Sequence, residues 1–171
     1  MRSAAVPAKH RRRAVIGLTA LLAFPPAACA QVESSCVVER VSDGDSITCG
    51  GERVRLLSID APELDQGPFG RAARAFLEAA LPVGSHVRLV LDIERRDQHG
   101  RLLAYVYRGD GRMVNRMMAR QGFALPLVVP PNVRHVEAIR AAADSARQSG
   151  VGLWAIDAFE CSPADHRARD C

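Results

Sequence analysis

The sequence has no hydrophobic run long enough to cross a membrane. Its longest apolar stretch, residues 14–24, has about half of the roughly 20 residues that a spanning helix needs. The sequence also contains no internal repeat and no linker-like segment. These absences exclude a membrane-spanning protein and a chain of several domains, and they leave one globular domain with a single core.

The cysteines lack the Cys-x-x-Cys pair with a nearby histidine that zinc sites use. Four cysteines follow the N-terminal segment: Cys36, Cys49, Cys161 and Cys171. An even number in an exported chain favours two disulfides over reactive thiols. Four cysteines allow three pairings, and we favour Cys36 with Cys49 and Cys161 with Cys171.

The first 30 residues have the pattern of a secretory signal peptide. Basic residues at 9 and 11–13 precede the apolar run, and Ala28 and Ala30 provide a small-residue cleavage site. Export through the paired arginines of the basic stretch, or lipidation of Cys29, are alternatives that we rank lower. We therefore expect residues 1–30 to be removed and residues 31–171 to form one secreted or periplasmic domain.

Residues 31–171 have no net positive charge. Of the 23 basic residues, five lie in that segment, so 18 arginines remain against 19 acidic residues and the net charge is near −1. The formal charge of +4 for the whole chain is therefore no indication of nucleic-acid binding. Any binding of nucleic acid must come from a local site.

Residue periodicity predicts an α+β domain. Five segments are typical of short strands: 36–41, 46–49, 53–59, 86–93 and 102–107. Three segments have helical composition: 69–81, 113–121 and 133–148. Trp154 is expected to fill the core beyond the last helix. This order predicts a five-stranded OB-fold Greek-key barrel with three helices.

Carboxylates follow two of the predicted strands. Asp43 and Asp45 lie in the turn between the first two strands, and Asp60 and Glu63 follow the third. In a meander these ends can lie side by side, so Asp45 and Asp60 could share a hard cation such as calcium. Pro62 stiffens the second segment. The alternatives are that Asp-Gly is a plain hairpin turn and that the second segment only caps the following helix.

Two arginines, Arg55 and Arg101, interrupt otherwise apolar strand sequence. A planar guanidinium with several donors suits a phosphate and the charge that builds on it in a transition state. Taken singly, each arginine is more often a solvent-facing strand residue. Their positions around the carboxylates favour a phosphate site.

These residues belong to motifs that resemble the staphylococcal nuclease, or thermonuclease, family over nearly all of residues 31–171. The motifs are Val41-Ser-Asp-Gly-Asp-Ser46, Val54-Arg-Leu-Leu-Ser-Ile-Asp-Ala-Pro-Glu63, Asp97-Gln-His-Gly-Arg-Leu-Leu-Ala-Tyr-Val-Tyr107, Met113-Val-Asn115, Arg120-Gln-Gly122 and Gly152-Leu-Trp154. The resemblance implies the same barrel with three helices. It also implies Ca²⁺-dependent hydrolysis of phosphodiester bonds in DNA and/or RNA. A monomer is the simplest expectation for the oligomeric state.

The resemblance also implies a role for each site residue. The implied Ca²⁺ ligands are Asp45, Asp60 and the backbone carbonyl of Ala61. Glu63 is implied to activate or position the attacking water. Arg55 and Arg101 are implied to bind the scissile phosphate, one stabilising the transition state and the other also the leaving group.

The sequence departs from the family at the edge of the site that contacts the nucleotide base and terminal phosphate. The loop 64–70 has no lysine, Gln98 and His99 stand where the family has a Lys-Tyr pair, and tyrosines are absent near Leu127 and Val129. Substrate affinity and end preference could therefore differ while the reaction is retained. His99 is expected to be a loop residue and not a catalyst.

Two other classes of function compete with the enzyme. A non-catalytic nucleic-acid-binding OB-fold module would be expected to lose catalytic residues, whereas this chain keeps the full set. A secreted barrel with a structural calcium site would leave the two arginines unexplained. The sequence therefore favours the nuclease, without determining DNA or RNA preference or endo or exo action.

Overall fold

The computed structural model describes Met1 and residues 33–171. The predicted signal peptide and its cleavage site lie outside the described residues. Five strands close into a barrel in the order β1-β2-β3-β6-β5. Their bounds are β1 Glu33–Val41, β2 Ser46–Cys49, β3 Glu52–Leu56, β5 His86–Arg96 and β6 Leu102–Arg108. The predicted OB-type barrel is confirmed.

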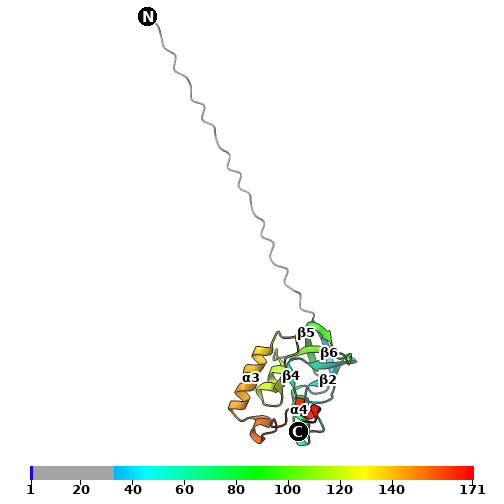
Figure 1. Cartoon of the computed structure of the whole chain (residues 1–171). Coiled ribbons are helices and arrows are strands. Elements are labelled where there is room, and N and C mark those ends of the chain that lie inside the picture. Colours follow the sequence, from blue (N-terminus) through cyan, green and yellow to red (C-terminus); the bar gives the residue numbers. More distant parts are fainter. Residues whose placement is uncertain (2–32) are drawn as a thin grey trace.

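The bounds of the helices are α1 Pro68–Ala80, α2 Val114–Arg120, α3 Val136–Gln148, the short 3₁₀ helix η1 Gly152–Ile156, and α4 Pro163–Ala168. In the view of Figure 1, α3 lies to the left of the barrel strands and α4 below them. The three predicted helices correspond to α1, α2 and α3, whereas η1 and α4 were not expected. Helices α2 and α3 pack on each other. In the view of Figure 1, β4 (Ile59–Asp60) lies between α3 and the barrel strands.

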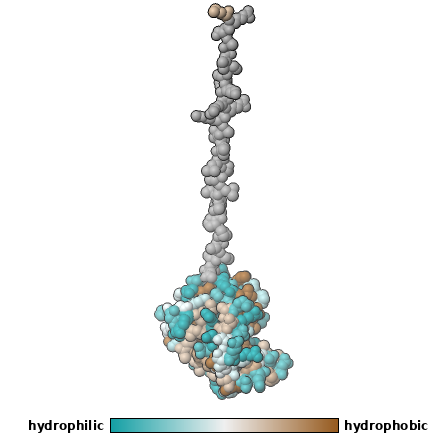
Figure 2. Space-filling model, turned by 90° about the vertical axis from the view of Figure 1, so that its left-hand side faces the viewer, coloured by the Kyte–Doolittle hydropathy of each residue, from teal (hydrophilic) through white to brown (hydrophobic). Residues whose placement is uncertain are grey.

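Strand alternation explains how β3 serves both the core and the cleft. Val54 and Leu56 are buried, whereas Arg53 and Arg55 point to the other face of the strand. The core continues through β6, where Tyr105 is fully buried. On the face of the molecule drawn in Figure 2, hydrophobic side chains are scattered among hydrophilic ones, as is usual for a protein surface.

The predicted third strand, 53–59, is wrong as one continuous element. Ser58 has a φ of 62°, which is unusual for a residue other than glycine, and the chain turns there. Beyond the turn, Ile59 and Asp60 form the short strand β4, which pairs with β7 (Leu125–Pro126) in a separate two-stranded sheet. The hydroxyl of Ser58 contacts the Tyr105 hydroxyl at 3.1 Å. This turn takes Asp60 out of the line of β3.

Trp154 does not fill the core as predicted. Its neighbour Leu153 is the buried residue, and Trp154 is only partly buried. The indole ring packs on Phe159 with ring centroids 4.6 Å apart. Its Nε1 has no hydrogen-bond partner among the described residues. Trp154 therefore covers the edge of the helical layer.

Both favoured disulfides are present. Cys36–Cys49 joins β1 to β2, and Cys161–Cys171 closes the C-terminal segment, with Cα–Cα distances of 5.6 and 5.9 Å. Each cross-link is worth about 2–4 kcal/mol, largely through restriction of the unfolded chain. No helix in residues 33–171 is both long and apolar enough to cross a bilayer.

Asn115→Ala is expected to lower the free energy of unfolding by about 2–4 kcal/mol. Asn115 is fully buried, its Oδ1 accepts from the Val106 N–H at 2.9 Å, and its Nδ2 donates to Leu57 O at 2.9 Å. It thereby ties α2 to β6 and to the turn before β4. Urea unfolding measures the change. Arg116→Ala, at an exposed neighbouring position, is the control, and a loss below about 1 kcal/mol for Asn115→Ala would contradict the prediction.

Candidate active site

The five predicted catalytic and metal-binding side chains line one cleft of about 840 Å³. They are Asp45, Arg55, Asp60, Glu63 and Arg101. Ala61 is buried behind them, and its N–H donates to Asp45 Oδ2 at 3.0 Å. Residues separated by up to 56 positions in sequence therefore meet at one place.

Arg55 joins the two buried aspartates. Its Nη1 lies 2.9 Å from Asp45 Oδ2, and its Nη2 lies 3.2 Å from Asp60 Oδ1. Nη1 also donates to the backbone carbonyls of Leu56 and Ile59 at 3.0 and 2.9 Å. The side chain is only 13% exposed. A planar guanidinium can satisfy these partners together, which a single ammonium group cannot do.

Asp45 lies in an environment that opposes its charge. Its pKa is raised to about 7, mainly by burial and also by the nearby carboxylates of Asp43 and Asp60, while Arg55 acts in the opposite direction. Asp60 is buried as well. Two buried carboxylates this close require positive charge between them, which Arg55 provides here and which a bound cation would increase.

The turn that carries Asp45 packs tightly against the segment that carries Asp60. A Cβ on Gly44 would lie 2.5 Å from Ala61 Cβ and 2.8 Å from Ala73 Cβ. Such distances are shorter than any van der Waals contact. The absence of a side chain at position 44 therefore keeps the two aspartates within reach of one guanidinium.

Gly44→Ala is expected to lower kcat/KM for the phosphodiester substrate that the sequence motifs imply about 10- to 100-fold, because the backbone must move and Asp45 moves with it. Overpacking should also lower the free energy of unfolding by about 1–3 kcal/mol. Steady-state kinetics and urea unfolding measure the two effects. Gly109→Ala is the matched control, since a Cβ there meets nothing within 4 Å. Equal activity of the two variants would contradict the close-packing account.

Glu63 projects from a turn that Gln66 fixes. The Glu63 N–H donates to Gln66 Oε1 at 2.8 Å, and the Gln66 N–H donates to Glu63 O at 3.0 Å. Helix α1 closes on the same turn, because a Cβ on Gly70 would lie 1.9 Å from Glu63 O. The Glu63 side chain itself is partly exposed. A partly exposed carboxylate on a fixed turn is suited to accept a proton from water in the cleft.

Arg101 is positioned by Asp97, a residue whose role was not predicted from the sequence. Arg101 Nε lies 2.7 Å from Asp97 Oδ2, and the Arg101 N–H donates to Asp97 Oδ1 at 3.0 Å. Burial acts to raise the pKa of Asp97, but the hydrogen bonds from Arg101 lower it overall. Because the pair uses Nε, the two terminal nitrogens of Arg101 can still reach a phosphate. The spacing Asp97-x-x-x-Arg101 is the sequence signal for this pair.

Arg167, in α4, is a further residue that the sequence did not indicate. Its Nη1 lies 2.8 Å from Glu63 Oε1 and 3.1 Å from Asp60 Oδ1, and its Nη2 lies 2.8 Å from Asp60 Oδ2. The hydrogen bonds with Asp60 raise the pKa of Arg167 above its usual range. No local pattern around residue 167 distinguishes it from the other arginines of the chain.

The cleft contains oxygen ligands that fit a hard cation. Among residues 33–171, no group of three or more His, Cys, Asp or Glu side chains is arranged to hold a metal ion. A site here would consist of two carboxylates completed by backbone oxygen and water, which calcium accepts. In this structure arginine side chains lie against both Asp45 and Asp60, so the donor set already attracts positive charge.

No Phe, Tyr or Trp side chain lines this edge of the cleft among the described residues, as the sequence departures suggested. Gln98, His99, Leu127 and Val129 line it. His99 is exposed in the loop before β6, and its carbonyl accepts from Arg53 Nη2 at 2.7 Å. It is therefore a loop residue in contact with β3. A base entering this edge meets Gln98, Leu127 and Val129, and the His99 imidazole in place of a tyrosine ring.

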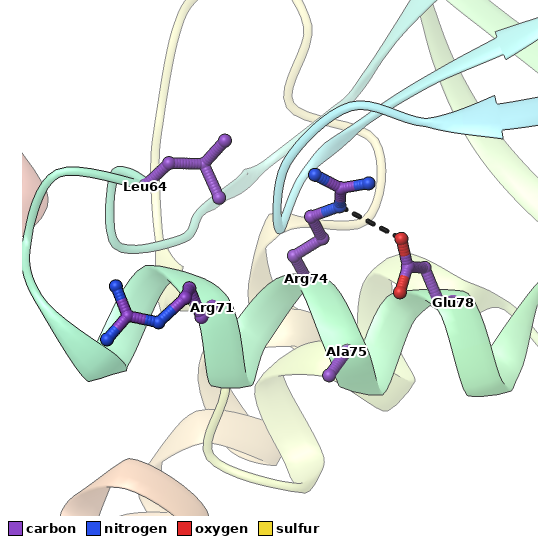
Figure 3. A pocket seen from close by; sticks show the side chains of 5 residues that line it. All are labelled: Leu64, Arg71, Arg74, Ala75 and Glu78. Atoms are coloured by element: carbon purple, nitrogen blue, oxygen red, sulfur yellow. Dashed lines mark hydrogen bonds and ion pairs between the residues drawn. The ribbon is translucent and has the colours of Figure 1, made fainter.

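A second, shallower hollow lies beside α1 (Figure 3). Leu64 faces the helix across it, and the Arg74 Nε in its wall is paired with Glu78 at 2.9 Å. The hollow has one carboxylate, already paired, and a volume of about 430 Å³. The larger cleft instead brings the three carboxylates of Asp45, Asp60 and Glu63 together, so it is the candidate active site.

The chain is similar to known proteins over most of its length. A family model described as "Staphylococcal nuclease homologue" matches residues 53–156. A thermonuclease of Staphylococcus intermedius is 37% identical over 129 residues, which cover 70% of this chain and 76% of that protein. An uncharacterized endonuclease of Haemophilus influenzae is 35% identical over 133 residues, covering 75% of this chain and 70% of that protein.

Not every similar protein has a nuclease name. A succinoglycan biosynthesis protein of Rhizobium meliloti is 32% identical over 123 residues, covering 67% of this chain and 61% of that protein. The matched residues 53–156 include the strand of Arg55, the segment of Asp60 and Glu63, and the loop of Arg101. Because the family model covers more than half of the chain and the five strands close into the predicted barrel, the chain belongs to the staphylococcal nuclease homologue family.

Proposed function

We propose that this protein is a calcium-dependent nuclease that cleaves phosphodiester bonds of DNA and/or RNA in the cleft lined by the turn before β2, by β3 and by the loop before β6. Membership in the family makes the chain a nuclease, a hydrolase that acts on phosphodiester bonds. One observation carries the assignment of the site. Arg55 bridges Asp45 and Asp60, with Glu63 and Arg101 in the same cleft.

The proposed roles follow from charge and exposure. Arg55 and Arg101 donate to the phosphate oxygens and stabilise the negative charge that develops on them. Glu63 accepts the proton of the attacking water, which its partial exposure allows. Asp97 holds Arg101 through Nε and so directs the guanidinium into the cleft. Arginines and carboxylates thus divide the work of charge stabilisation and proton transfer.

The proposed calcium ligands are Asp45, Asp60 and the backbone carbonyl of Ala61. A calcium ion held there would supply Lewis-acid stabilisation of charge on the phosphate. Asp45 and Asp60 are buried and joined by Arg55, so this chain keeps two hard oxygen ligands together before the ion arrives.

We also propose that residues 1–30 are a signal peptide and that the mature domain is exported. The two disulfides support this proposal, because disulfides persist mainly in oxidising compartments. The oligomeric state is proposed to be monomeric.

The first experiment incubates residues 31–171 with single-stranded DNA, duplex DNA and RNA, in calcium or in excess chelator. An Arg55→Ala variant is assayed in parallel. Cleavage that requires both calcium and Arg55 is the expected result, and the relative rates rank the substrates. Binding of oligonucleotide without cleavage of any substrate would contradict the proposal and favour the non-catalytic binding module.

A further inference from the structure

We propose that Arg167 competes with the metal ion for Asp60, so that the disulfide-closed C-terminal segment sets the metal affinity of the active site. The proposal rests on the proposed function, because it concerns the same cleft. It makes Arg167 a residue that controls metal binding.

The contacts of Arg167 occupy the atoms that a cation would use. Its two terminal nitrogens lie 3.1 Å from Asp60 Oδ1 and 2.8 Å from Asp60 Oδ2, so both oxygens of this carboxylate are taken. The same Nη1 lies 2.8 Å from Glu63 Oε1. A divalent ion that binds Asp60 must displace at least one of these hydrogen bonds. Arg167 therefore opposes metal binding for as long as it holds this position.

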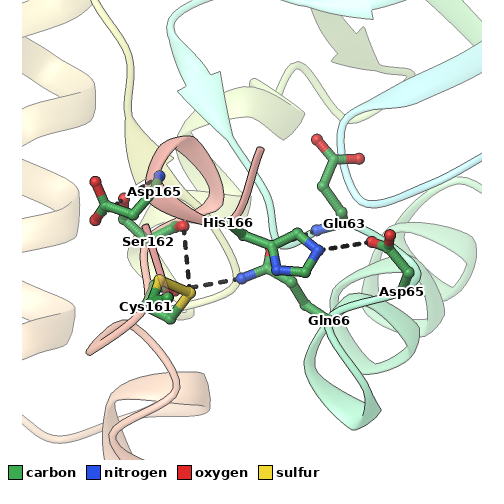
Figure 4. The surroundings of a disulfide bond; sticks show 8 residues. Glu63, Asp65, Gln66, Cys161, Ser162, Asp165 and His166 are labelled. Atoms are coloured by element: carbon green, nitrogen blue, oxygen red, sulfur yellow. Dashed lines mark hydrogen bonds and ion pairs between the residues drawn. A yellow bond between two sulfur atoms is a disulfide. The ribbon is translucent and has the colours of Figure 1, made fainter. Parts of the chain in front are cut away.

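The segment that carries Arg167 is anchored to the turn that carries Glu63 (Figure 4). His166 Nε2 lies 3.0 Å from Asp65 Oδ1, and Gln66 Nε2 donates to the Cys161 carbonyl at 3.3 Å. Gln66 is buried and also accepts from the Glu63 N–H. The two residues that follow Leu64 thus hold α4 against the cleft, and Arg167 is delivered next to Glu63.

The disulfide keeps this short segment in place. Helix α4 has six residues, and Ser162 caps it by accepting from the Asp165 N–H at 3.1 Å. A helix of this length is not stable by itself in water. Cys161–Cys171 closes the chain around it with a sequence separation of 10. The cross-link therefore holds the Arg167 guanidinium at a high effective concentration beside Asp60.

Arg167 is the arginine of this cluster that a metal can displace. Its side chain is 42% exposed, compared with 13% for Arg55. Arg55 also donates to two backbone carbonyls, whereas Arg167 is bound to Asp60 and Glu63 by side-chain contacts alone. A partly exposed ion pair contributes little net free energy. Arg167 can therefore be replaced at Asp60 while Arg55 stays between the aspartates.

The test is a calorimetric titration of calcium into residues 31–171 without nucleic acid. Arg167→Gln is expected to bind calcium about three- to tenfold more tightly than the wild type, because the competing cation is removed. Arg169→Gln removes the same charge from an exposed position two residues away and is the matched control. Its affinity should stay within about twofold of the wild type, since exposed charges are screened.

A second variant releases the segment without changing Arg167. The double replacement Cys161→Ser with Cys171→Ser leaves the Cys36–Cys49 disulfide intact, and it should tighten calcium binding in the same direction. Wild-type affinity in Arg167→Gln, or an equal gain in Arg169→Gln, would overturn the proposal. If neither the wild type nor any of the variants bound calcium, both the competition by Arg167 and the proposed calcium dependence would be overturned. A shifted affinity without any cleavage would reject the nuclease while supporting the competition.

Discussion

Arg55→Ala is expected to lower kcat for phosphodiester cleavage by about 10²- to 10³-fold, the effect of losing a donor aimed at charge in the transition state. The free energy of unfolding of the variant should also be about 3 kcal/mol lower than that of the wild type, because Asp45 and Asp60 are buried and lose the guanidinium that joins them. Single-turnover kinetics at saturating substrate measure the first effect, and urea unfolding measures the second.

Calcium separates the two consequences of this substitution. A cation that binds only the folded protein adds free energy of unfolding as its concentration rises, so calcium should restore stability to Arg55→Ala without restoring its rate. Arg55→Lys keeps the charge but cannot reach both aspartates and two backbone carbonyls, so it should also be slow. A lysine variant with more than about a third of wild-type activity would refute a specific need for the guanidinium.

Glu63→Gln is expected to lower kcat by about 10²- to 10⁴-fold, the range for loss of a proton acceptor. The substitution keeps the size of the side chain and the backbone contacts with Gln66, which do not involve the carboxylate. Calcium affinity and oligonucleotide binding should therefore change little. Quench-flow kinetics measure the rate, and calorimetry and fluorescence anisotropy measure the two affinities.

The control for Glu63→Gln is Glu78→Gln on the exposed side of α1, which removes a carboxylate that pairs only with Arg74. This variant should retain wild-type turnover. If Glu63→Gln lost calcium binding as well as rate, Glu63 would be a ligand and not a proton acceptor. If it kept turnover within about tenfold of the wild type, another group would have to accept the proton.

Elements with strong local signals were predicted well. Strand β2 has the predicted bounds, and α1, α2 and α3 lie within three residues of theirs at each end. Alternation along a strand and caps at a helix end depend on neighbouring residues. The same holds for Asp45, Arg55 and Asp60, which lie within 16 positions of each other. Their closeness in sequence made it possible to predict that they meet.

The break at Ser58 could not be read from the sequence. Leu57, Ser58 and Ile59 continue the β-favouring composition of β3, so local propensity predicts a continuous strand. The chain instead turns where Ser58 meets Tyr105 and where Asn115 binds the Leu57 carbonyl. Contacts with β6 and α2 override the local preference and turn Asp60 toward Asp45.

The sequence by itself determined the barrel, the two disulfides as the favoured pairing, and the identity of the five candidate site residues, because each follows from local pattern or from motifs. The tertiary structure decided which groups hold them. Parallel pairing of β3 with β6 sets Arg55 opposite Leu103, two residues from Arg101, and the C-terminal segment brings Arg167 to Asp60, 107 residues away. Contacts between residues so far apart in sequence depend on how the elements pack. A six-residue helix is too short to show a periodicity from which its packing partner could be predicted.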